Sequence, residues 1–439
     1  MADQVEQILR EADRPVQPRD EFRDRLLGEL LASLQATRVE RSARRRFPLV
    51  RDLAVAAMLL VFVAALVIGF RGLRAARLLA PVGPAPIVSI SPSKMVSPTT
   101  GWAFTGDRLV RTTDGGVQWV DVSPPSLPDR VPVDTSAYFL DARHAWITET
   151  TGGSGFSLVS FRTSDGGRTW QQGARVGAPG VGGDGVSPQL YFIDALHGWL
   201  LLRGESTAGQ PSPTLYSSSD GGLRWTLTSS NPGSPLGCTA WQMAFASAST
   251  GWLTTTCPST QVGPSLLMTQ DGGITWHVQP LPLTTSKVIC PCSLDPPVFF
   301  NHARGILVVH GSPGALLVTS DGGSIWTARS LPGDDQMEVD FADADHGWAI
   351  AGPSAQLVKN PFSLTEPAVA LPLYHTADGG VTWVPVRTDL LLQSQDGRID
   401  SLSFVDQKNG FASRVTSLGP SQLLKTTDGG IIWTVVRPR

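Results

Sequence analysis

The sequence predicts an all-β protein, a seven-bladed β-propeller preceded by a short α-helical segment and one transmembrane helix. The prediction rests on an eight-residue pattern that recurs seven times, a second pattern that alternates with it, and an apolar run near the N-terminus. Self-similarity with a period near 50 residues is typical of propeller blades. The predicted domains are a helical segment over residues 1–52, a transmembrane helix over 53–70, a linker over 71–84 and the propeller over 85–439.

The recurring eight residues read Ser/Thr-x-Asp-Gly-Gly-x-x-Trp, and their aspartates are separated by 51, 55, 51, 50, 57 and 50 residues. Asp-Gly is a strong turn signal because glycine takes positive φ without a Cβ clash, and the carboxylate can accept N–H groups of the turn. Each copy is therefore expected to be a structural corner of a β-hairpin. The marker residues are Asp114, Asp165, Asp220, Asp271, Asp321, Asp378 and Asp428, with Trp119, Trp170, Trp225, Trp276, Trp326, Trp383 and Trp433.

A second pattern, an apolar strand followed by Asp-x-x-x-Gly-Trp, lies between these copies and is clearest at residues 192–199 and 341–348. Of the 13 tryptophans, only Trp241 lies outside the two repeat positions, so tryptophan is expected to hold the blades together. Four short antiparallel strands make one propeller blade. In the sixth repeat they are predicted at residues 339–341, 347–351, 373–376 and 382–386, and the ring is expected to close without exchanging a strand.

The eight-residue pattern resembles the Asp-box, also called the BNR repeat, of sialidases, sortilin-type receptors and photosystem II assembly/stability factors. The resemblance covers roughly residues 85–439 and is greatest to the photosystem II assembly/stability factors. In that family the propeller is a non-catalytic platform for protein partners during complex assembly. The resemblance therefore implies a scaffold that binds a protein outside the cytoplasm, without catalytic residues, cofactor or metal.

A carbohydrate-active module is the main alternative, because sialidases also carry Asp-boxes. The Phe/Tyr-Arg-Ile-Pro signature of sialidases is absent from this sequence. Loop carboxylates such as Asp184, Asp334 and Asp335 leave a paired-carboxylate glycosidase open. The tyrosines available as a sialidase-type nucleophile lie in no recognisable sialidase context; they are Tyr138, Tyr191, Tyr216 and Tyr374.

Histidines and overall charge bear on two further classes of ligand. His144, His197 and His346 occupy equivalent turns of different blades, so they are expected to cap turns rather than to bind one metal ion. Residues 81–439 carry 21 Lys and Arg against 28 Asp and Glu. Nucleic-acid-binding surfaces are basic, so no nucleic-acid partner is expected.

The N-terminal region predicts a membrane anchor. Residues 53–70 are 18 uncharged, almost wholly apolar residues, which is long enough to span a bilayer core. Six arginines lie between residues 38 and 51 and three between 71 and 77, which favours a cytoplasmic N-terminus and a propeller outside the plasma membrane. Apolar residues at helical spacing predict an amphipathic helix over residues 18–37. It could dock a cytoplasmic partner, as in a transmembrane sensor, or form a small hairpin without one.

Two features of the propeller region concern cross-links and binding loops. Four cysteines outside the cytoplasm fit disulfides, and Cys238–Cys257 is the preferred pair because the two flank one hairpin. The pairing of Cys290 and Cys292 stays open. Binding usually resides in loops on a rigid scaffold. The longest insertion, residues 352–372, carries Phe362 and Leu364 as candidate partner-binding anchors.

Overall fold

The computed structural model describes residues 94–105, 108–125, 136–151, 157–177, 186–204, 213–232, 239–256, 265–283, 293–311, 313–333, 337–351, 369–392, 398–415 and 421–437. The chain divides after Arg74, and all of these residues belong to the second unit, Ala75–Arg439. The predicted amphipathic helix, apolar run and linker lie outside the described residues. In the described ranges, no helix has the length and hydropathy needed to cross a membrane.

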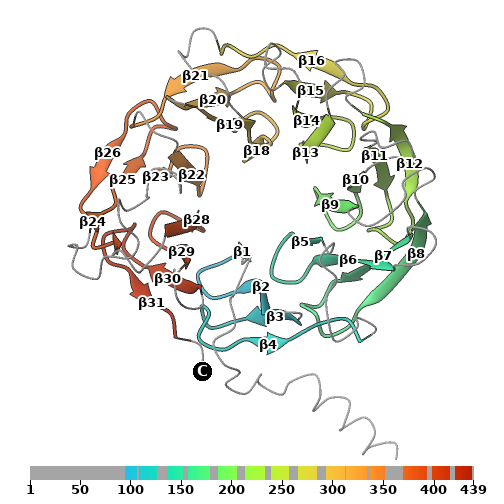
Figure 1. Cartoon of the computed structure of the whole chain (residues 1–439), viewed down its shortest axis with the longest axis horizontal. Coiled ribbons are helices and arrows are strands. Elements are labelled where there is room, and N and C mark those ends of the chain that lie inside the picture. Colours follow the sequence, from blue (N-terminus) through green and yellow to red (C-terminus); the bar gives the residue numbers. More distant parts are fainter. Residues whose placement is uncertain are drawn as a thin grey trace, which may run out of the picture. The chain divides into compact units, whose positions relative to one another are not determined.

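Seven antiparallel sheets, built from consecutive strands, form a ring in which each sheet runs from the centre to the edge (Figure 1). This arrangement confirms the predicted seven-bladed all-β propeller. Blades 1 to 3 are formed by β1 (Lys94–Met95), β2 (Gly101–Thr105), β3 (Arg108–Thr112) and β4 (Val120–Asp121), by β5 (Ala137–Phe139), β6 (Ala145–Thr151), β7 (Ser157–Thr163) and β8 (Gln171–Gly177), and by β9 (Ser187–Phe192), β10 (Gly198–Arg203), β11 (Thr214–Ser218) and β12 (Thr226–Ser230).

Blade 5 departs from the regular pattern. Its innermost strand is in two pieces on either side of Pro296 and Pro297, which lack the N–H that a ladder needs, and both pieces pair with β19. Blades 4 and 5 are formed by β13 (Thr239–Phe245), β14 (Gly251–Thr256), β15 (Leu266–Thr269) and β16 (His277–Gln279), and by β17 (Ser293–Leu294), β18 (Val298–Phe299), β19 (Gly305–His310), β20 (Ala315–Thr319) and β21 (Thr327–Ser330).

Blade 6 has the four strands expected from its repeat, plus a small separate ladder between β24 (Val369–Ala370) and β27 (Leu391–Leu392). Blades 6 and 7 are formed by β22 (Met337–Phe341), β23 (Gly347–Ala351), β25 (Leu373–Thr376) and β26 (Val384–Val386), and by β28 (Arg398–Phe404), β29 (Gly410–Val415), β30 (Gln422–Thr426) and β31 (Thr434–Val435).

The ring closes between blade 7 and blade 1 through side chains. The first sheet contains only β1–β4 and the last only β28–β31, so no strand is exchanged, as predicted. Lys425 Nζ donates a hydrogen bond of 3.0 Å to the carbonyl oxygen of Pro98. Phe411 of blade 7 and Met95 of blade 1 are buried in one apolar cluster.

Aromatic stacking holds neighbouring blades together. The tryptophan that follows the glycine at the start of the second strand (Ala145 in blade 2) lies flat against the phenylalanine that ends the innermost strand of the next blade. Blades 5 and 7 carry Ile306 and Phe411 at the tryptophan position. The stacked pairs, with their ring-centroid distances, are Trp102–Phe139 (5.5 Å), Trp146–Phe192 (3.8 Å), Trp199–Phe245 (3.6 Å), Trp252–Phe299 (4.6 Å) and Trp348–Phe404 (3.7 Å).

Candidate functional site

The seven Asp-box turns share one internal hydrogen-bond pattern. In blade 6, the Thr376 hydroxyl donates to Asp378 Oδ1 (2.8 Å) and accepts the Gly380 N–H (2.8 Å). Asp378 also accepts the backbone and side-chain donors of Thr382, at 2.9 and 2.6 Å. Hydrogen bonds from Thr382 lower the pKa of Asp378 to about 2. The carboxylate is thus engaged by its own turn, and both glycines, at φ 71° and 90°, adopt the left-handed conformation that the turn requires.

The tryptophans that end the Asp-boxes are also engaged in structural contacts. In blades 1, 4 and 7 the indole N–H donates to the carbonyl of the second glycine of its own box, at 2.9–3.0 Å. Trp170 and Trp225 donate to the preceding blade, to the Val122 carbonyl and the Ser160 hydroxyl. The indole N–H groups of Trp326 and Trp383 are buried without a partner among the described residues.

The tyrosines considered for catalysis and the histidines considered for metal binding are held in the scaffold. Burial raises the pKa of the Tyr138, Tyr191 and Tyr216 phenols, which disfavours the phenolate that a nucleophile needs. The Nδ1 atoms of His144, His197 and His346 lie 2.8–2.9 Å from carboxylate oxygens of the aspartates in their own turns. Within the described part of the chain, no three His, Cys, Asp or Glu side chains are placed to hold a metal ion.

Several predicted site residues lie outside the described residues and stay predictions. They include the cysteines of the preferred disulfide and the anchors of the long blade 6 insertion. The residues concerned are Cys238, Cys257, Cys290, Cys292, Phe362, Leu364, Asp184, Asp334 and Asp335.

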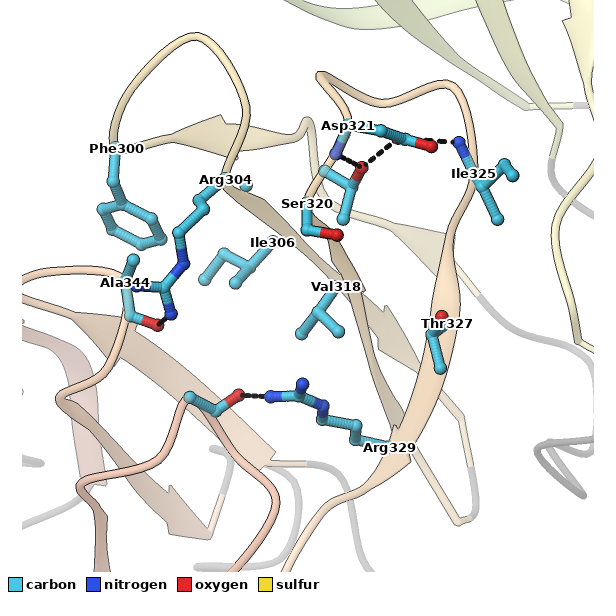
Figure 2. Close-up of a pocket in the computed structure, with 13 residues that line it drawn as sticks. Phe300, Arg304, Ile306, Val318, Ser320, Asp321, Ile325, Thr327, Arg329 and Ala344 are labelled. Atoms are coloured by element: carbon cyan, nitrogen blue, oxygen red, sulfur yellow. Dashed lines mark hydrogen bonds between the residues drawn. The ribbon is translucent and has the colours of Figure 1, made fainter.

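The described residues instead form a pocket of about 410 Å³ between blades 5 and 6, beside the Asp-box of blade 5 (Figure 2). Its walls combine apolar side chains with two arginines. Ile325, in the Asp-box turn, is 69% exposed. The apolar lining is Phe300, Ile306, Val318 and Ile325, and the arginines are Arg304 and Arg329.

The two arginines reach across to blade 6. Arg304 Nη1 lies 3.0 Å from Asp345 Oδ2, and Nη2 donates to the Ala344 carbonyl at 2.9 Å, so both terminal nitrogens of this guanidinium are engaged. Its hydrogen bonds lower the pKa of the Asp345 carboxyl. Arg329 Nη1 donates to the Gly379 carbonyl at 2.5 Å, whereas its Nε and Nη2 have no partner among the described residues (Figure 2). The pocket thus offers free donors of Arg329 next to aliphatic surface.

A second pocket, of about 790 Å³, occupies the equivalent place between blades 3 and 4. Its lining residues Trp199 and Ser217 occupy the same positions in the repeat as Ile306 and Val318 of the first pocket. The far wall repeats as well, because Ala248 and Gly272 match Ala344 and Gly379 in the repeat. We call these two pockets groove 5/6 and groove 3/4.

The residue immediately before the Ser/Thr of the Asp-box distinguishes blades 3 and 5, which line the two grooves, from the other five blades. In the other five blades this residue is longer, and in blades 1, 2 and 7 it donates a hydrogen bond to a backbone carbonyl of the next blade. In blades 3 and 5 it is Ser217 and Val318, which are too short to cover the neighbouring blade. Arg111, Arg162 and Lys425 donate to the carbonyl oxygens of Ala142, Asp220 and Pro98, respectively. His375 lies 4.8 Å from the Trp348 ring, and Met268 packs on the apolar cluster that contains Trp252.

Near the centre of the ring, the innermost strands carry a lysine and an aspartate. Lys94 Nζ donates to the Phe139 carbonyl at 2.9 Å, and Asp340 Oδ2 accepts the Phe404 N–H at 2.6 Å. Burial raises the pKa of Asp340 to about 6 and lowers the pKa of Lys94, and each charge partly opposes the shift of the other. Asp340 therefore couples the contact between blades 6 and 7 to pH.

The free energy of unfolding is expected to fall as the pH rises from about 4 to about 6, because unfolded Asp340 loses its proton near 3.8 and folded Asp340 keeps it until about 6. Asp340→Asn should remove this contribution, since its Oδ1 still accepts the Phe404 N–H. Urea unfolding of both proteins across this pH range measures the difference. Carboxylates with a lowered pKa, such as Asp378, make the free energy of unfolding rise with pH, but they do so equally in both proteins. Identical pH profiles of the two proteins would therefore contradict the raised pKa of Asp340.

No protein-family model and no curated protein matches the sequence. Solved structures share the fold. A xyloglucanase of family GH74 from Xanthomonas campestris is 14% identical, with a TM-score of 0.50 over 82% of this chain and 56% of that chain. YCF48 from Cyanidioschyzon merolae is 17% identical (TM-score 0.48; 78% and 97% of the two chains), and YCF48 bound to a D1 peptide is 16% identical (0.47; 78% and 94%). At these identities the similarity shows the fold alone.

Proposed function

We propose that the chain is a membrane-anchored protein whose propeller lies outside the cytoplasm and acts as a non-catalytic platform for protein partners. The observation that carries this proposal is the open groove 5/6, with exposed Ile325 and free donors on Arg329. Such a groove suits an extended polypeptide, whose side chains would cover Ile306 and Val318 while a main-chain carbonyl or carboxylate accepts from Arg329.

The carboxylates at groove 5/6 favour binding over glycoside hydrolysis. A glycosidase needs two carboxyl groups that flank the scissile bond and remain free to act as acid and as nucleophile or base. Asp321 accepts the N–H of Ile325 in its own turn, and Asp345 is paired with Arg304. Their hydrogen bonds lower the pKa of both carboxyl groups, which disfavours the protonated form that a general acid needs, so the groove is better suited to holding a ligand.

The anchor and the topology of this proposal rest on the sequence. The apolar run at residues 53–70 would lie in the plasma membrane, and the excess of arginine before it would keep the N-terminus in the cytoplasm. Residues 18–37 would then be available to a cytoplasmic partner. The partners of the propeller itself would be proteins outside the cytoplasm.

The test is a crosslinking pull-down from native membranes with the full-length chain and two matched variants. Val318→Met places a longer side chain in groove 5/6 and should fill part of it, and we expect the captured partner to fall about tenfold, equivalent to about 1.4 kcal/mol. Ser217→Met makes the same change in groove 3/4 and should leave that partner in place.

Two outcomes would overturn the proposal. If Val318→Met retains the protein partner, groove 5/6 does not form its binding site. If the full-length chain captures glycans and no protein, the carbohydrate-active alternative replaces the platform.

A further inference from the structure

Trp241, the tryptophan outside both repeat positions, sits in a β-bulge of blade 4. In the β13–β14 ladder Ala240 pairs with Thr255 and Gln242 pairs with Thr254, which leaves Trp241 as the extra residue. Bulges frequently re-aim a side chain next to a binding site. The Trp241 side chain is 50% exposed, whereas the tryptophans of the Gly-Trp pairs are buried. The bulge thus presents an indole that the blade contacts do not use.

Arg203, at the end of β10 in blade 3, lies against this indole. Its guanidinium carbon is 4.6 Å from the Trp241 ring centroid, a cation–π contact between neighbouring blades. Gln189 lies on the same face of blade 3, because it pairs with Leu201, two residues before Arg203. The Nε atom of Arg203 and the Oε1 atom of Gln189 are buried and have no partner among the described residues.

The charge of Arg203 is poorly compensated. Burial lowers its pKa, and no described carboxylate forms an ion pair with it. A half-buried cation without a counter-ion is unfavourable, and a carboxylate supplied by a ligand would form a charge-assisted hydrogen bond with it. An uncompensated cation beside an exposed aromatic ring is therefore expected where a ligand supplies the counter-charge.

This cluster of Trp241, Arg203 and Gln189 is separate from groove 3/4, although it involves the same two blades. Groove 3/4 is lined by Asp-box residues and by Trp199, next to the start of β10. Arg203 is the last residue of β10, at the opposite end of the strand. Blocking groove 3/4 or groove 5/6 should consequently leave the cluster intact.

We propose that Trp241 and Arg203 form a hot spot for an acidic segment of a partner protein. The segment places a carboxylate on the terminal nitrogens of Arg203 and an apolar side chain on the exposed face of Trp241. This inference rests on the proposed protein-binding function and names the chemistry of a second contact. Trp and Arg are enriched in protein hot spots. An acidic sugar would need more converging polar groups for its hydroxyls than one guanidinium and one amide provide.

The experiment selects a phage-displayed library of random peptides on the immobilised full-length chain. We expect enrichment of peptides in which Asp or Glu adjoins an apolar residue. For a synthetic copy of an enriched peptide, Trp241→Ala and Arg203→Gln should each weaken binding about tenfold or more. Arg203→Lys should restore only part of the affinity, because lysine keeps the charge but not the planar fork. Val318→Met should leave the affinity unchanged.

The outcomes separate this inference from the groove proposal. Enriched peptides that lack acidic residues, or that bind Trp241→Ala as tightly as the unmodified chain, would overturn the hot spot. Polygalacturonate binding that Trp241→Ala abolishes, without any enriched peptide, would overturn it in favour of an acidic polysaccharide. If peptides bind at Trp241 but Val318→Met still captures the protein partner from membranes as well as the unmodified chain does, only the groove proposal is overturned.

Discussion

Trp348→Ala is expected to lower the free energy of unfolding by about 3–5 kcal/mol, because it opens a cavity in the contact between blades 6 and 7. Trp348 is 1% exposed, and its ring lies 3.7 Å from the Phe404 ring at an interplanar angle of 4°. Its indole N–H also donates to the Gly429 carbonyl at 3.0 Å. The substitution removes the buried ring, the stacking and a hydrogen bond that joins two blades.

Trp241→Ala is the matched control, since it deletes the same side chain at a half-exposed site. Its expected effect on the free energy of unfolding is below about 1 kcal/mol. Urea unfolding of the full-length chain, followed by near-ultraviolet circular dichroism, measures both variants. Equal destabilisation by the two would show that the aromatic stack does not stabilise the ring.

Thr376→Val is expected to cost about 1–3 kcal/mol, although valine has nearly the shape of threonine. The Thr376 side chain is 1% exposed, and its hydroxyl is the acceptor of the buried Gly380 N–H. Valine would leave that N–H without an acceptor in a place that water does not reach. The loss should appear as a lower urea midpoint with an unchanged slope.

Thr382→Val in the same turn provides the comparison. The Thr382 hydroxyl donates to Asp378 Oδ2 at 2.6 Å, but both groups face solvent, so water can replace the lost donor. The midpoint should shift less than with Thr376→Val. The reverse order would mean that the exposed carboxylate, rather than the buried hydroxyl, holds the Asp-box together.

The fold could be predicted from the sequence because each repeat encodes its turns locally. Asp378, Gly379 and Gly380 form one hairpin corner with bonds that stay inside the corner, so the count of motifs equals the count of blades. The strands expected for blade 6 agree with β22, β23, β25 and β26, with β22 starting two residues earlier and β26 two residues later.

The candidate grooves could not be predicted in the same way. Ser217 and Val318 look like ordinary strand residues, and their short side chains matter only because a neighbouring blade lies opposite them. Comparing the residue before each Ser/Thr across the seven repeats would have singled them out. Trp241 was identified in the sequence as an exception, but its exposure follows from the bulge at residues 240–242, which no local pattern signals.

Closure of the ring by side chains also has a consequence for biosynthesis. Because β1–β4 are consecutive in the chain, blade 1 holds all its strands once residue 121 has been made, long before blade 7 exists. Nascent chains fold domain by domain from the N-terminus. Each blade can pair its strands before the next blade is made, although it buries its apolar face only when that neighbour packs against it. The final event is the docking of the last sheet on the first, as Lys425 reaches Pro98.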